Sequence, residues 1–163
     1  LDSLIRKRLA KAIRTAIAKL PTGINIYDYI YNDVMGRIEG QLQDQEELAK
    51  QVLSWIMCAK RPLTITELQY ALAIEVSDSK LDEENLPQLE DIVSVCTGLV
   101  TIDEESGIIR LVHYITQEYF ERIQRQWFPD AQINITTMYV TYLSFNEFES
   151  GICPNDKEFE QRL

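Results

Sequence analysis

The stretch from residue 99 to residue 113 most constrains the fold of this chain. Two short apolar runs, LVTI and IIRLVH, lie on either side of the acidic stretch DEESG. Apolar runs around a glycine-containing turn predict a β-hairpin, with Gly107 in the turn. Helical periodicity precedes and follows this hairpin, so we expect a mainly helical fold with one small β element.

Three helices are predicted before the hairpin, and the second has the clearest start signal. In RPLTITEL, Thr64 and Glu67 have the spacing of a capping box, in which each side chain satisfies a backbone N–H at the helix start. Leu63 and Leu68 have the spacing of the accompanying hydrophobic staple. We expect this helix to extend to about Ile74.

The first and third helices are indicated by apolar spacing and by their ends. The first begins in the acidic stretch DQEELAKQ and ends at Pro62. The third covers residues 86–97, with Pro87 in its first turn and Gly98 as its C-terminal stop.

A fourth helix is predicted to begin at about Thr116, after the hairpin. Three helices, a two-stranded hairpin and a helix therefore follow one another over residues 45–128. This is the order of a winged helix, in which the hairpin is the wing.

Further segments lie on both sides of the winged helix. Residues 2–20 predict an amphipathic helix with a basic face, and residues 25–43 predict another, weakened by glycines near its end. A basic amphipathic helix can lie on a membrane or on nucleic acid, but its apolar face lacks Trp and Phe, which favours a bundle helix. Residues 133–143 fit a strand by composition and a helix by spacing.

The charge distribution argues against a role in DNA binding. Net charge is −10; residues 1–20 carry six bases and one acid, and the rest carries 10 bases and 25 acids. Residues 86–97 would be the DNA-reading helix, yet they contain Glu90 and Asp91 and no Lys or Arg. We therefore expect no nucleic-acid partner. We also expect no membrane span, because no run of about 18 apolar residues occurs.

Catalysis and metal binding are not indicated either. No GxSxG and no GxxxxGK[ST] motif occurs, and no cysteine lies near His113, the only histidine. Cys58, Cys96 and Cys153 are widely spaced, so we expect reduced thiols in a cytoplasmic protein and no zinc. The chain should have no catalytic residues, no metal and no cofactor of its own.

His113 has two interpretations at this point. On strand alternation it shares a face with Ile109 and Leu111, which favours a hydrogen-bonded ring at the edge of the core over a sensor. The aromatic residues that follow it, Tyr119, Phe120, Trp127 and Phe128, are expected in the core.

Several stretches resemble a known family in their order along the chain. They are LDSL, LP, VLSWI, RPLTITEL, CTGLV, LVHYITQEYF, WFP and YLSFNEFESGIC. Together they look like the region after the nucleotide-binding core of NACHT-type signal-transduction (STAND) ATPases, especially the fungal NACHT–ankyrin proteins. The winged-helix part is also similar to the domain named after GPI inositol-deacylase.

This resemblance implies a domain arrangement and partners. Residues 1–44 would be the helical domain that ends the NACHT module, residues 45–128 the winged helix, and residues 129–163 a helical spacer before ankyrin repeats. Residues 133–143 would then be helical. The chain, which begins without Met, would be a piece of a longer ATPase that binds ADP or ATP with Mg. Its partners would be its own NACHT domain and ankyrin repeats in cis, and other copies on oligomerisation.

The resemblance also implies a role for His113. In such relatives the histidine at this place donates a hydrogen bond to the β-phosphate of ADP and holds the protein closed. Gln117 and Glu118 would support His113 or cap a neighbouring helix. Ile115 departs from the threonine often found there in the fungal relatives. Because the phosphate-binding loop is absent, we expect the role to be latent and this chain to bind ADP poorly or not at all. The alternative is an acidic winged-helix interaction or scaffold module unrelated to an NTPase.

Overall fold

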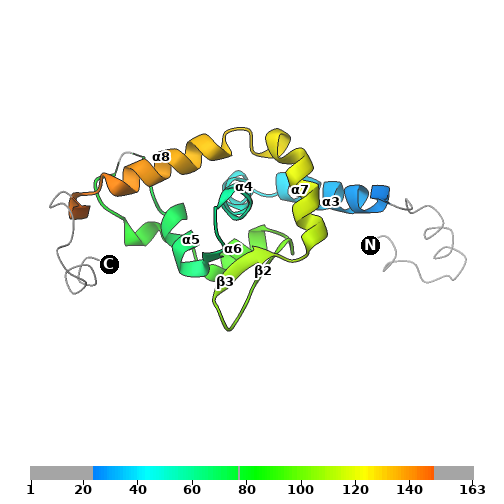
Figure 1. Cartoon of the computed structure of the whole chain (residues 1–163), viewed down its shortest axis with the longest axis horizontal. Helices are drawn as coiled ribbons and strands as arrows, with labels where there is room; N and C mark the ends of the chain where they lie inside the picture. Colours follow the sequence, from blue (N-terminus) through cyan, green and yellow to red (C-terminus); the bar gives the residue numbers. More distant parts are fainter. Residues whose placement is uncertain (1–23, 77, 149–163) are drawn as a thin grey trace, which may run out of the picture.

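A computed structural model describes residues 24–76 and 78–148 of the 163-residue chain (Figure 1). The amphipathic helix expected at residues 2–20 and Cys153 lie outside these ranges. The helices and strands are α3 (Ile24–Glu39), α4 (Gln43–Cys58), β1 (Leu63–Thr64), α5 (Ile65–Leu72), η1 (Glu83–Asn85), α6 (Leu89–Val95), β2 (Val100–Ile102), β3 (Ile108–Leu111), α7 (Tyr114–Trp127), α8 (Ala131–Leu143) and η2 (Asn146–Phe148). The expected mainly α winged-helix order is confirmed.

The start of α5 follows the local prediction. The Glu67 backbone N–H donates to the Thr64 hydroxyl at 3.2 Å, and the Thr64 N–H donates to the Glu67 carboxylate at 2.9 Å. This reciprocal pair is a capping box. Leu63 and Leu68 are both buried in the core, as a hydrophobic staple requires.

The β element is larger than the predicted two-stranded hairpin. It is a three-stranded antiparallel sheet with the order β1–β3–β2, so the wing hairpin gains a strand from the start of α5. Leu63 pairs with Ile109, and Thr64 pairs with Ile108. The reason is that the cap residue Thr64 has an extended backbone, with φ −74° and ψ 159°, which suits a ladder position as well as a cap.

The third predicted helix begins later than expected. Pro87 lies before α6, whose N-cap is Gln88. The carbonyl oxygen of Pro87 accepts a hydrogen bond at 2.9 Å from the Gln69 side chain of α5. At the other end, Thr97 and Gly98 have φ values of 48° and 85°, so two residues in the left-handed region stop the helix. Glycine adopts that conformation readily, whereas the β-branched Thr97 is strained there.

The core surrounds α4, which Figure 1 shows near the centre of the molecule, with α8 on one side and the sheet on the other. Val52 and Leu53 of α4 are fully buried. The ambiguous segment 133–143 is helical, as the resemblance implied. Ala131 and Ile135 of α8 are buried in the common core, and the ring of Tyr139 lies 5.5 Å from that of Trp55.

Helix α3 shares this core and is tied to α7. Val34, Met35 and Ile38 of α3 are buried in it. Between the two helices, hydrogen bonds link Tyr31 with Thr116 at 2.9 Å and Tyr119 with Asn32 at 2.7 Å, and an ion pair links Arg122 with Asp28. Tyr119, Phe120 and Phe128 are buried and Trp127 is half-buried, so the expected aromatic core is confirmed.

Candidate functional site around His113

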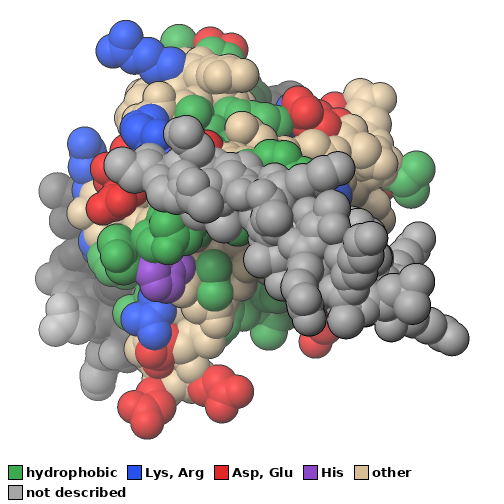
Figure 2. Space-filling view, turned by 90° about the vertical axis from the view of Figure 1, so that its right-hand side faces the viewer, with side chains coloured by type: hydrophobic (Ala, Val, Ile, Leu, Met, Phe, Trp, Pro, Cys, Tyr) green, Lys and Arg blue, Asp and Glu red, His purple; other side chains and the backbone are tan. Residues whose placement is uncertain are grey.

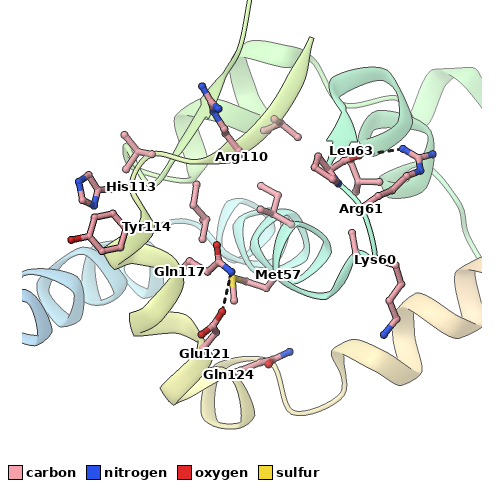
Figure 3. A pocket seen from close by; sticks show the side chains of 16 residues that line it. Met57, Lys60, Arg61, Leu63, Arg110, His113, Tyr114, Gln117, Glu121 and Gln124 are labelled. Atoms are coloured by element: carbon pink, nitrogen blue, oxygen red, sulfur yellow. Dashed lines mark hydrogen bonds between the residues drawn. The ribbon is translucent and has the colours of Figure 1, made fainter. Parts of the chain in front are cut away.

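A groove of about 590 Å³ lies beside His113, between the end of α4, the β1 side of the sheet and the start of α7 (Figure 3). The apolar part of its lining, which we call the apolar floor, includes Met57, Leu63 and Leu111. Polar side chains also line the groove: Lys60, Arg61, Arg110, His113, Gln117, Glu121 and Gln124. A volume of this size is in the range of pockets that bind small molecules or short peptide segments.

His113 is exposed, so the interpretation as a ring at the edge of the core is wrong. Ile109 is buried and Leu111 half-buried, but the chain leaves the strand after Leu111. His113 has an extended backbone, with φ −149° and ψ 149°, and is the N-cap of α7. Its Nδ1 accepts a hydrogen bond from the Ile115 backbone N–H at 3.2 Å. This cap is why α7 begins at Tyr114, two residues earlier than predicted.

The capping bond determines the donor that His113 can offer. A neutral imidazole has one N–H donor and one acceptor nitrogen. Since Nδ1 accepts from Ile115, Nε2 carries the proton and can donate. Within the described ranges, Nε2 has no hydrogen-bond partner. Figure 2 shows the histidine ring at the surface, beside apolar side chains and one basic side chain.

The two candidate support residues differ in their placement. Gln117 lies one turn along α7 and lines the groove with His113, but its amide donates to Glu121 at 2.9 Å. Glu118 is exposed and does not line the groove. In residues 24–76 and 78–148, neither side chain hydrogen-bonds His113.

Three basic residues around the groove were not predicted from the sequence. Lys60 and Arg61 precede β1 and Arg110 lies in β3, so the β1–β3 pairing places all three around one groove. They lie at separate points around the groove in Figure 3, and among the described residues Glu121 is the one acid that lines it. This locally basic surface contrasts with the net charge of −10 for the chain.

Two of these bases form ion pairs. Arg61 binds both carboxylate oxygens of Glu67, at 2.9 and 2.6 Å. The hydrogen bond from Arg61, followed by that from the Thr64 backbone, lowers the pKa of Glu67 to about 2. Arg110 contacts Asp103 at 3.3 Å. The Ser106 backbone N–H is the main cause of a lowered pKa at Asp103.

The acids of α6 and of the wing turn, and the cysteines of the described residues, lie outside this groove. Glu90 and Asp91 are exposed on α6, and Glu104 and Glu105 are exposed in the wing turn. Cys58 is half-buried and Cys96 is buried; burial raises the pKa of the Cys96 thiol to about 12. The described part of the chain has no group of three side chains suited to hold a metal. Nor does any helix there have the length and apolar character to cross a membrane.

Comparisons with known proteins agree with this architecture. Residues 38–126, more than half of the chain, match the family described as "GPI inositol-deacylase, winged helix domain". A curated relative, "Azaphilone pigments biosynthesis cluster protein L" of Monascus ruber, is 35% identical over 118 residues. That alignment covers 62% of this chain but only 25% of the relative, so the chain spans a small part of the relative's length. No solved structure matches.

Proposed function

The chain belongs to the GPI inositol-deacylase winged-helix family, a non-catalytic type of domain, and we propose that it regulates a NACHT-type STAND ATPase. In this proposal it couples the nucleotide state of that ATPase to a change of conformation and to oligomerisation during signalling. The parent protein would be cytoplasmic and would carry an upstream NACHT domain and downstream ankyrin repeats. The family match supports the winged helix, and the geometry of His113 supports the regulatory role.

The single observation that carries the proposal is the exposed Nε2–H of His113 at the start of α7. The cap with Ile115 fixes the ring so that its donor faces away from the helix backbone. A donor held in this way can bind a phosphate oxygen presented by a neighbouring domain. Bound ADP would supply that oxygen, and loss of the contact on exchange for ATP would release the winged helix.

Helix α7 offers a physical route from His113 to the rest of the chain. It begins directly after His113, and Thr116, Tyr119 and Arg122 follow at intervals of three along the face that contacts α3. A displacement of the N-cap would therefore move the helix that contacts α3 through these three residues. Such a contact biases the balance between a closed and a released arrangement, as a two-state switch requires.

The test compares two substitutions in the full-length parent protein. His113→Leu removes both the cap and the Nε2 donor, whereas His113→Asn keeps a good N-cap and replaces the imidazole donor with a shorter amide. We expect both variants to release ADP faster than the unchanged protein and to oligomerise without the signal. Unchanged ADP retention in folded His113→Asn would contradict the sensor role.

The alternative function is an acidic winged-helix scaffold for protein–protein interaction, without an NTPase. The exposed acids on α6 and in the wing turn favour it over DNA binding. The gene of the parent protein distinguishes the two functions. A phosphate-binding loop upstream and ankyrin repeats downstream are expected for the ATPase, and a parent with neither would leave the scaffold as the better explanation.

A further inference from the structure

The central strand β3 has an open edge on the groove side. The N–H of Val112 donates to Leu99 at 2.9 Å, and the N–H of Asp103 donates to Ile108 at 2.9 Å, so residues 108 and 112 bond toward β2. Because bonding direction alternates along a strand, Leu111 directs its N–H and C=O to the opposite side, where β1 lies.

Strand β1 ends before it reaches this position. Its pairing partners are Ile108 and Ile109, and the register would place Arg61 opposite Leu111. Residues 59–62 instead line the groove, and Figure 3 shows Lys60 and Arg61 across it from His113. Neither the β1–β3 register nor the backbone hydrogen bonds outside the ladders give the Leu111 N–H and C=O a partner within the described ranges. An unpaired strand edge of this kind can accept an extended segment as a further strand.

Side chains around the edge indicate the chemistry of such a segment. On the inner side, the side chain of Leu111 forms part of the apolar floor together with Met57. On the outer side, Arg110 is exposed and Val112 is 52% exposed. Successive residues of a paired strand would alternate between these two sides.

The charge of the groove favours acidic residues on the outer side. Lys60 forms no ion pair with the described residues, and it is exposed. Arg61 and Arg110 have partners, but their side chains are 66% and 63% exposed. A guanidinium has five N–H groups, so both arginines keep donors for a further carboxylate.

We propose that the groove beside His113 binds an extended acidic segment of a partner protein, which pairs with the Leu111 edge of β3. The segment has an apolar residue over the floor, between two acidic residues that contact Lys60, Arg61 and Arg110. Main-chain hydrogen bonds supply the pairing, and the alternating side chains supply the specificity. This proposal does not depend on the nucleotide role of His113.

The test is a titration of this chain with a short end-capped peptide of alternating glutamate and valine, followed by heteronuclear NMR. We expect saturable shifts at Leu111 and slower hydrogen exchange of its amide. A peptide of alternating lysine and valine should not bind. A glutamate–valine peptide with methylated backbone nitrogens should bind much more weakly, because it cannot pair with the strand.

Matched charge reversals locate the binding site. Lys60→Glu should weaken peptide binding about fivefold or more, whereas Lys80→Glu, an equal change at an exposed lysine outside the groove, should not. The proposal would be overturned if both variants lost peptide affinity equally, or if the methylated peptide bound as tightly as the unmethylated one. Either result would indicate only a general effect of charge. Saturation of the same amides by inorganic phosphate, with no peptide binding, would also overturn it.

Discussion

The pairing of Glu67 with Arg61 and Thr64 predicts a specific dependence of stability on pH. The perturbation is Glu67→Gln, which removes the charge but keeps an oxygen that can accept from the Thr64 N–H. Glu67 has a usual pKa of 4.5, and in the folded chain its pKa is about 2. A lowered pKa means that the ionised carboxylate stabilises the fold above about pH 4.5. This stabilisation is lost as the pH falls toward 2.

The magnitude follows from the shift and the exposure of the pair. Each pKa unit corresponds to about 1.4 kcal/mol, which would give about 3 kcal/mol for a pair shielded from water. The side chains of Arg61 and Glu67 are 66% and 39% exposed, so solvent screens the interaction. We therefore expect Glu67→Gln to lower the free energy of unfolding by about 1 kcal/mol at neutral pH.

Urea unfolding of both proteins at neutral pH, at pH 4.5 and at about pH 2 measures this effect. The difference between the two proteins cancels the titration of the other carboxylates, provided that these are unaffected. We expect the difference of about 1 kcal/mol at neutral pH to begin to fall near pH 4.5 and to be largely lost at about pH 2. A difference that is the same at all three pH values would refute the assigned role of the Glu67 charge.

Further predictions concern stability and DNA. Thr97→Gly should raise the free energy of unfolding by about 1 kcal/mol in urea, because it relieves a β-branched residue at φ 48° and removes a buried hydroxyl without a partner. In this chain His113→Leu should cost about 1 kcal/mol through loss of the α7 cap, and His113→Asn should restore it. Tyr119→Phe should cost about 1 kcal/mol by removing the bond to Asn32, and should speed hydrogen exchange in α3. A mobility-shift assay at low salt should detect no duplex DNA binding beyond that contributed by residues 1–20, checked with a chain that lacks them.

Local sequence patterns predicted the structure correctly where that structure depends only on residues close together in the sequence. The capping box at Thr64 and Glu67 requires only a four-residue stretch, and it forms as predicted. The segment 133–143 was different, because its composition and spacing conflict. Burial of Ile135 in the core around α4 decides in favour of a helix, and no local pattern reports that contact.

The site was predictable only in part for the same reason. Sequence alone singled out His113 but placed it at the core edge, because strand alternation could not show that the chain turns into α7 there. The basic groove required the pairing of β1 with β3, which places Arg61 and Arg110, from distant parts of the chain, around one groove. Arg110 belongs to no motif around His113 that would have indicated this role.

The pairing of β1 with β3 joins residues that are distant in sequence, and this affects the order in which the protein folds during synthesis. During synthesis the Thr64–Glu67 cap can form as soon as α5 exists, and the wing hairpin can close within a short stretch. Leu63 cannot reach its partner Ile109 until the chain has extended through the hairpin. Because contacts between distant residues form slowly, we expect the sheet to be completed late. The groove, and any surface for a partner that depends on it, would then appear only when the winged helix is whole.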